Sequence, residues 1–102
     1  TFVEAARHLA ERMLMQDGDD LAKIRHGWRL ALVREPESRE SQVLALSLAK
    51  YRTVYESDEE AAKALLATGE SSRDKTLAPA EHAAWTMIAQ TILNLDETIT
   101  QP

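Results

Sequence analysis

Three polar side chains near the C-terminus, Asn94, Asp96 and Glu97, are the residues whose types and spacing best suit ligand binding. They fall in the last turns of a predicted helix, where an exposed acid opposes the helix dipole at a cost of about 0.3–1 kcal/mol. Asn94 and Glu97 are three positions apart, so they share a helix face and could hold a cation or a partner's arginine. Ion pairs with arginines of neighbouring helices would explain the same residues without any site, and this is the simpler interpretation.

Glu70 is a second candidate contact residue. It opens a polar stretch, residues 70–77, that has no helical or strand periodicity. Ser71 and Ser72 follow it, but a serine nucleophile needs a base within reach and an oxyanion hole, usually at a turn after a strand. No strand is predicted in this chain. We therefore expect no catalytic residue here and interpret Glu70 as a contact to another domain.

Histidine and cysteine give no sign of a metal or cofactor site. No two of the three histidines show the His-x-x-x-His spacing of a helical metal site. Glu4 and His8 lie four positions apart, but an ordinary intrahelical pair explains them as well as half a metal site does. Because the chain has no cysteine, a disulfide framework, a thiolate nucleophile, a Cys-type zinc site and covalent haem attachment are excluded. We expect no metal and no cofactor.

Charge and length limit the function classes further. Seventeen acidic against twelve basic residues give a net charge of −5, which disfavours binding to nucleic acid. The arginines alternate with acids, a pattern typical of a solvated surface of mixed charge. No apolar run approaches the roughly 20 residues that span a bilayer, and no signal-peptide pattern opens the chain. A length of 102 residues suits one domain, and because helical periodicity starts almost at Thr1 we expect a fragment of a larger protein.

Helical periodicity predicts the elements that must position these residues. The apolar stripes indicate five helices, at residues 2 to about 15, 21 to about 33, 38 to about 56, 59 to about 67 and 79 to about 98. We therefore predict an all-α fold, a compact bundle of about five helices with short connections, as a single domain over 1–102. The four aromatic residues on the stripes are expected in the core: Trp28, Tyr51, Tyr55 and Trp85.

Residues typical of helix termini predict where the helices begin and end. Gly18 suits a helix C-terminus, and Asp19 or Asp20 suits the next N-cap. Ser57 or Asp58 can cap the fourth helix, and Pro79 suits the first turn of the fifth. These signals are local, so they predict where helices begin and end and say little about how the helices pack.

Several motifs, in order along nearly the whole chain, resemble those of one family. Residues 33–40 (VREPESRE) are similar to a Gly-Arg-x-Pro-Thr-x-x-Glu junction, and residues 65–71 (LLATGES) to a Leu-Leu-x-x-Gly-Glu-Ser turn. Residues 84–86 and 93–98 (AWT and LNLDET) are similar to an Ala-Trp and Leu-Asn-Leu-Asp-Glu helix end. Together they resemble the C-terminal part of the planctomycete domain-of-unknown-function family numbered 1553. Glu37 stands where that family usually has Thr and Val33 where it often has Gly, so the cap would come from Ser38 or from Glu37's carboxylate.

The resemblance implies an exported or periplasmic, multi-domain bacterial parent, in which this piece is C-terminal and often accompanied by a cytochrome-c-like module. It assigns no activity. We expect a structural or interaction module that packs on the parent's other domains or on a partner. The alternative is a part of an enzyme active site, polysaccharide-active or redox-linked, completed by upstream domains and using Glu70, Asp96 or Glu97. An exposed apolar patch beside these acids would favour the module, and a concave acidic pocket with raised carboxylate pKa values would favour the enzyme.

Overall fold

Five α-helices make up the fold in the computed structural model, which describes residues 2–32, 34–67 and 75–100, with side chains for 3–32, 34–67 and 75–95. The helices are α1 (Phe2–Met15), α2 (Asp20–Ala31), α3 (Ser38–Ser57), α4 (Glu59–Leu66) and α5 (Pro79–Thr100). Within these residues there is no strand, and no helix is both long and apolar enough to cross a membrane. The predicted all-α class and all five predicted helices are confirmed.

Side-chain caps fix several helix starts. The Asp19 carboxylate accepts a hydrogen bond from the Ala22 N–H at 2.9 Å and caps α2, and Asp58 accepts one from the Ala61 N–H at 3.0 Å and caps α4. Each cap is worth about 1 kcal/mol, because it satisfies an N–H that has no partner within the helix. Gly18 adopts φ 113°, a left-handed backbone that suits glycine, and so lets the chain turn between α1 and α2.

The junction between α2 and α3 follows from its proline. α2 was predicted to about residue 33 but ends at Ala31, because Leu32 takes an extended backbone with φ −124° and ψ 156°. Pro36 then keeps the residue before it out of helical geometry. Glu37 is the N-cap of α3, and its N–H donates to the Glu40 carboxylate at 2.8 Å. The cap is therefore at Glu37 and not at Ser38.

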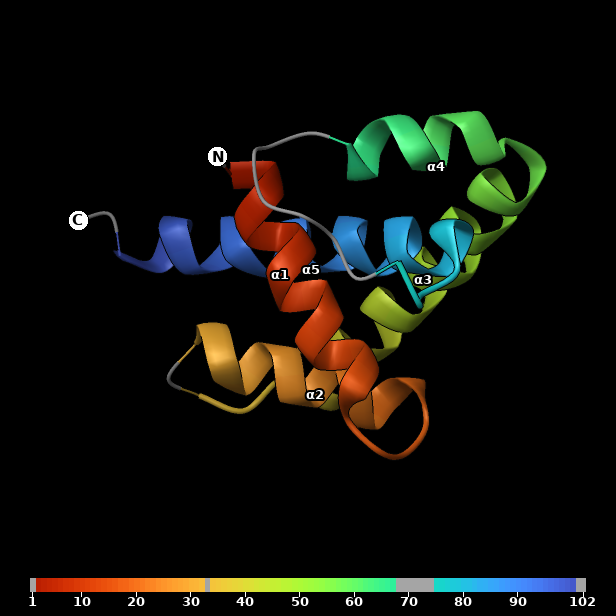
Figure 1. Ribbon diagram of the computed structural model, residues 1–102. Coiled ribbons are helices and arrows are strands. Elements are labelled where there is room, and N and C mark those ends of the chain that lie inside the picture. The colour runs from red at the N-terminus through yellow and green to blue at the C-terminus, as the bar shows by residue number, and fades with distance from the viewer. Residues whose placement is uncertain (1, 33, 68–74, 101–102) are drawn as a thin grey trace.

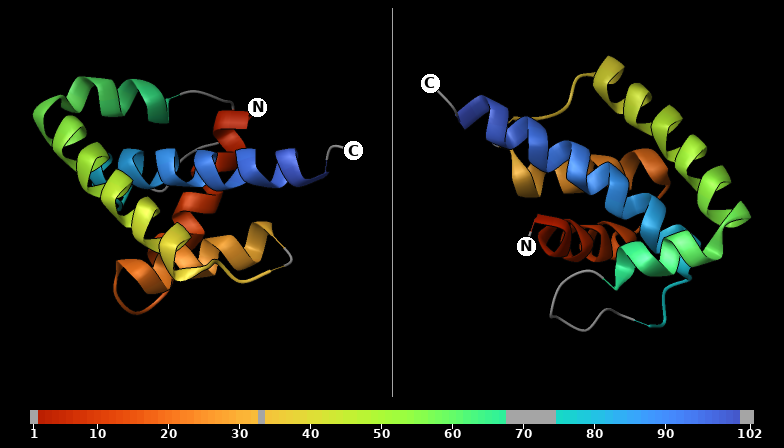
Figure 2. Two further views of the ribbon diagram at one scale, coloured as in Figure 1. Left: turned by 180° about the vertical axis from the view of Figure 1, so that it is seen from behind. Right: turned by 90° about the horizontal axis from the view of Figure 1, so that it is seen from above.

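α5 is the central helix of the bundle, and each of the other four contacts it. In Figure 1 it crosses the middle of the molecule, with α1 in front of it, α2 below and α4 above. Figure 2 shows α1 and α3 on opposite sides of α5. This position explains the broad apolar face predicted for the last helix, since a helix packed on several sides needs more than one apolar stripe.

Both tryptophans lie in the main core, where Trp28 from α2 and Trp85 from α5 are fully buried. Around them pack residues of four helices and the segment after α2: Ala6, Leu9, Ala10, Met13, Ile24, Leu32, Leu44, Leu48, Ala84, Ile88, Ala89 and Ile92. Tyr51 and Tyr55 are half-buried at its edge, and Tyr55 also contacts a smaller cluster of Ala62, Leu66 and Ala83. The prediction that the aromatic stripes form the core is confirmed for the tryptophans and partly for the tyrosines.

Candidate functional site

The residues predicted to bind a ligand lie toward one end of α5 or outside the described part of the chain. Asn94 is exposed on the C-terminal half of α5. Asp96 and Glu97 continue the same helix, but their side chains lie outside the described residues, as does the whole of Glu70. The structure therefore does not test whether Asn94, Asp96 and Glu97 act together. Around Asn94 it does show a neighbouring surface, described below.

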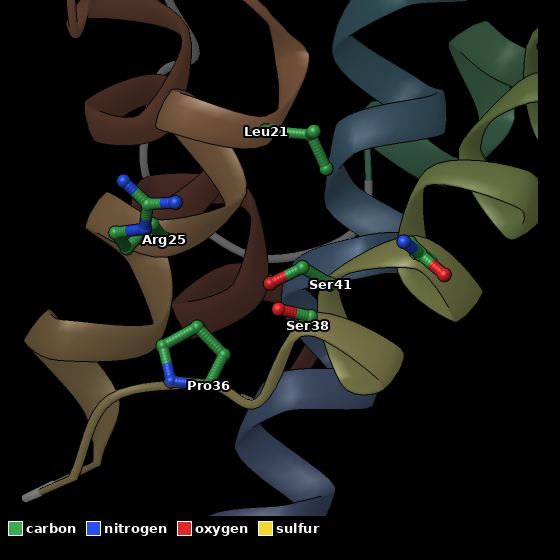
Figure 3. Close-up of a pocket in the computed structure, with 6 residues that line it drawn as sticks. Leu21, Arg25, Pro36, Ser38 and Ser41 are labelled. Atoms are coloured by element: carbon green, nitrogen blue, oxygen red, sulfur yellow. The ribbon is translucent and has the colours of Figure 1, made fainter.

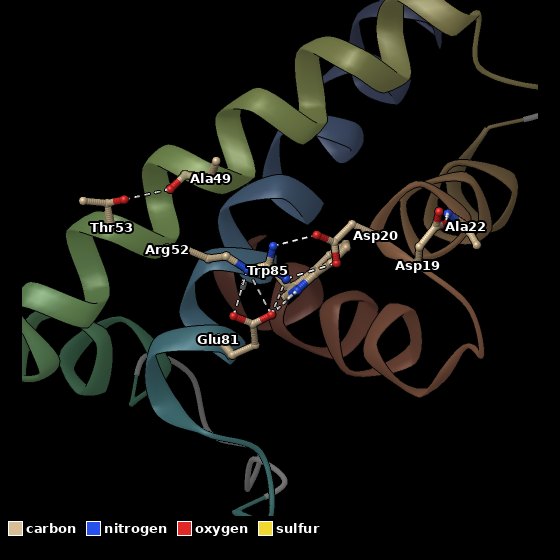
Figure 4. A network of polar contacts seen from close by, with 8 residues as sticks. All are labelled: Asp19, Asp20, Ala22, Ala49, Arg52, Thr53, Glu81 and Trp85. Atoms are coloured by element: carbon tan, nitrogen blue, oxygen red, sulfur yellow. Dashed lines mark hydrogen bonds and ion pairs between the residues drawn. The ribbon is translucent and has the colours of Figure 1, made fainter.

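An ion-pair network that joins three helices is the most extensive polar feature of the described residues (Figure 4). The Arg52 guanidinium, from the middle of α3, donates from Nη1 and Nη2 to the Asp20 carboxylate at 2.6 and 3.1 Å. It also donates from Nε and Nη2 to Glu81, at 3.0 and 2.5 Å. Trp85 Nε1 donates to the same Glu81 carboxylate at 3.1 Å, and the Arg52 guanidinium lies 5.8 Å from the centre of the Trp85 ring. We call Arg52, Asp20 and Glu81 the Arg52 clamp.

The electrostatics of the Arg52 clamp suit a structural role. Hydrogen bonds from Arg52 lower the pKa of Asp20 and of Glu81, although partial burial opposes the shift in both. The two carboxylates in turn raise the pKa of Arg52. Both acids lie in the first turn of a helix, where negative charge is also favoured by the helix dipole. Carboxylates held ionised in this way are poor proton donors, so the clamp fixes α2, α3 and α5 and offers no general acid.

A second polar contact lies between α1, α4 and α5. Arg7 is only 2% exposed, and its Nη1 donates to the Leu66 carbonyl at 2.7 Å, which satisfies an end carbonyl of α4. His82 is fully buried beside it, with Nε2 3.5 Å from the Arg7 carbonyl and 3.5 Å from a Glu11 carboxylate oxygen. The prediction of a solvated arginine surface is thus wrong for Arg7. The available signal was its spacing, because Arg7 lies three positions before the buried Ala10 and so shares a helix face with it.

Three hollows open on the surface of the described residues. One, about 250 Å³, is lined by Arg12, Met15, Gln16 and His26. The smallest, about 140 Å³, lies between α2 and the start of α3 and is lined by Leu21, Arg25, Pro36, Ser38, Ser41 and Gln42 (Figure 3). It is smaller than the roughly 300–1,000 Å³ typical of sites for small organic ligands. Leu21, at its edge, is 39% exposed. This hollow has room for a few water molecules only.

The largest of these three hollows is an apolar groove of about 350 Å³ between α2, α3 and α5. We call it the α3–α5 groove. It is lined by Trp28, Arg39, Glu40, Val43, Leu44, Thr91 and Leu95. Its lining is mostly apolar, and Leu95 adjoins the exposed Asn94 on α5. Arg34 holds Glu40 at the rim by two hydrogen bonds of 2.8 and 2.9 Å, which help lower the pKa of Glu40 to about 2.

Trp28 adds a second observation at this groove. The residue is buried, yet its Nε1–H has no hydrogen-bond partner among the described residues. An unsatisfied buried donor costs about 1–3 kcal/mol, so native proteins seldom leave one without a reason. Arg34 lies 5.1 Å from the centre of the same indole ring and covers it. The donor itself is enclosed and is not presented at the groove surface.

Three described carboxylates have a clearly shifted pKa, and the direction is opposite to that expected of an acid catalyst. The three whose pKa clearly departs from the ordinary value, Asp20, Glu40 and Glu81, are all shifted downward, mainly by hydrogen bonds from arginines. Within the described residues, no group of three or more acidic or histidine side chains is placed to hold a metal ion. The side chains of Glu70, Asp96 and Glu97 lie outside the described residues, so whether an apolar patch or an acidic pocket adjoins them stays a prediction.

No protein-family model, no curated protein and no solved structure matches the chain. The resemblance of residues 33–40, 65–71, 84–86 and 93–98 to the planctomycete family therefore stays a prediction.

Proposed function

We propose that this chain is a helical interaction module that packs, through the α3–α5 groove, on the other domains of a larger exported protein or on a partner protein. The observation that carries the proposal is the groove itself, with apolar walls from Leu44, Thr91 and Leu95 open to solvent. An open apolar hollow of this kind is more typical of an interaction site than of a solvated surface. Thr91 and Leu95 in its wall belong to the C-terminal half of α5, the part of the helix predicted to make such contacts.

Charge at the rim of the groove supports the same proposal. Exposed Arg39 at the rim would favour an acidic group on the partner. Contacts of this type between domains are usually modest in area and partly polar, so the module would bind its neighbour without losing its own fold.

A binding measurement in trans tests the proposal. The chain is titrated calorimetrically with the upstream part of the parent protein, expressed separately. We expect binding, and we expect Thr91→Glu, which places a charge in the groove, to weaken it at least tenfold. Ala5→Glu, at an exposed position of α1 outside the groove, is the control and should bind normally. Absence of binding, or equal binding by the Thr91→Glu variant, would contradict the proposal.

A further inference from the structure

The smallest of the three hollows, between α2 and the start of α3, is lined by polar side chains that bond to nothing else in the described part of the chain. Four of its six lining residues are polar, and none of their side chains makes a hydrogen bond or an ion pair with a described residue: Arg25, Ser38, Ser41 and Gln42. We call this space the α2–α3 hollow. Figure 3 shows the hydroxyl groups of Ser38 and Ser41 directed to the same side, into the space that separates them from α2 and Arg25.

Ser41 indicates that this space has an occupant. The residue is only 8% exposed, so bulk water barely reaches it, yet its hydroxyl has no partner among the described residues. Buried polar groups of native proteins nearly always have a hydrogen-bond partner, either in the protein or in a bound molecule. The partner of Ser41 is therefore expected in the α2–α3 hollow.

An occupant of the hollow faces mainly hydrogen-bond donors. Arg25 has only donors, and the N–H groups of Ser38 and Arg39 have no partner within α3, because they lie in its first turn. These N–H groups also lie at the positive end of the helix dipole, an arrangement that binds phosphate and sulfate. No lining residue is acidic. Such a site suits an anion better than water, because water has to donate hydrogen bonds as well as accept them.

Most acids near the hollow are already neutralised. Five lie within three positions of a lining residue, and three of the five are ion-paired with arginines: Asp20, Glu35 and Glu40. Asp19 caps α2. Glu37, at the start of α3, forms no ion pair with a described residue, so it is the acid that most opposes an anion in the hollow.

We propose that the α2–α3 hollow binds one tetrahedral oxyanion, phosphate or sulfate. The hollow of about 140 Å³ has room for a few water molecules, and one phosphate group takes the place of such a cluster. Donors come from both walls, with Arg25 on α2 and two serines on α3, so an ion with oxygens on all sides satisfies more of them than a planar carboxylate does. The inference goes beyond the proposed function, because the hollow and the α3–α5 groove share no lining residue.

An NMR titration of the isotope-labelled chain with sodium phosphate, at constant ionic strength and in a buffer without other oxyanions, tests the site directly. We expect saturable chemical-shift changes at the N–H groups of Ser38, Arg39 and Ser41. The dissociation constant should be about 1–10 mM, because the site has one guanidinium and is open to solvent. Sodium sulfate should change the same signals.

Variants of the lining residues identify the donors. Arg25→Gln should weaken phosphate binding at least fivefold, and Ser41→Ala severalfold. Arg12→Gln, at an exposed arginine of α1 outside the hollow, is the matched control and should bind normally. Glu37→Asn removes the opposing charge and supplies a residue that caps helices well, so it should tighten binding by about two- to fivefold. Without phosphate, each variant should still melt cooperatively, which separates loss of the site from loss of the fold.

Glycerol phosphate distinguishes the two sources of the anion. Binding as tight as that of phosphate indicates a phosphoryl group carried by a larger molecule, much weaker binding indicates the free ion, and either result supports the site. Three results would overturn the inference: acetate that binds as tightly as phosphate, Arg25→Gln that binds as tightly as the natural chain, or shifts that rise without saturation and so report an adventitious ion only. Thr91→Glu should bind phosphate normally, so failure of the proposed function leaves this test unaffected.

Discussion

Replacing Arg52 with methionine should destabilise the fold by about 1–3 kcal/mol. The guanidinium makes two-point contacts to both Asp20 and Glu81. Because the two carboxylates keep 42% and 35% of their side-chain surface exposed, each pair is worth the upper part of the range for surface pairs, about 0.5–1 kcal/mol. Loss of the contact with the Trp85 ring adds up to about 1 kcal/mol. Methionine keeps the aliphatic stem of the side chain, so packing changes little.

Urea and thermal unfolding followed by circular dichroism measure this loss. For a domain of this size, 1 kcal/mol corresponds to roughly 4–8 °C in Tm. Arg25→Met, at an exposed arginine of α2, is the control and should change stability by less than about 0.5 kcal/mol. Double-mutant cycles with Asp20→Asn and Glu81→Gln should each give a coupling energy of about 0.5–1 kcal/mol. A loss below about 0.3 kcal/mol, or cycles without coupling, would refute the view that the clamp holds the three helices.

Three further perturbations test other parts of the fold. Hydrogen bonds from Arg34 and from the Glu37 N–H lower the pKa of Glu40 from 4.5 to about 2, so these contacts stabilise the fold above pH 4.5 and are lost as the pH falls toward 2. An Arg34→Gln variant keeps only the second contact, so its Tm should fall less over that pH range than the Tm of the natural chain. A Cβ added at Gly27 would lie 2.5 Å from the sulfur of Met13, so Gly27→Ala should lower the free energy of unfolding in urea by about 1–3 kcal/mol. Met13→Ala removes the clashing side chain, so it should lower stability less in the Gly27→Ala background than in the natural chain. Arg7→Met removes the hydrogen bond to the buried Leu66 carbonyl at the end of α4, so it should lower the free energy of unfolding by about 1–3 kcal/mol. Amide hydrogen exchange in α4 should become faster, and unchanged exchange there would contradict the capping role of Arg7.

The helices could be predicted because residues close to each helix start determine where the helix begins. Asp19 and Asp58 each bond to the backbone three positions ahead, and Pro79 begins α5, so a short stretch of sequence is enough to find each start. The predicted end of α2, at about residue 33, lies beyond the observed end at Ala31, and the reason is again local. The apolar periodicity continues through Leu32, but the backbone of Leu32 is already extended.

The polar contacts could not be predicted in the same way. Asp20, Arg52 and Glu81 are separated by 32 and 29 positions, and only the packing of α2, α3 and α5 brings them together. In the sequence Arg52 resembles any other arginine among acids. The α3–α5 groove is likewise a property of three helices, whereas the prediction from residue types pointed to Asn94, Asp96 and Glu97. Of these, only Asn94 has a described side chain, and it lies beside the groove wall formed by Leu95.

The central position of α5 has a consequence for the biosynthesis of the protein. α5 follows the other four helices in the chain, yet each of them packs against it. While a ribosome is still adding α5, the apolar faces of α1 to α4 are already made and have no complete core to cover them. At roughly 5–20 residues per second, the 22 residues of α5 take about one to four seconds to synthesise. During that interval the nascent chain presents a binding surface to chaperones, and a translational pause within α5 would prolong it.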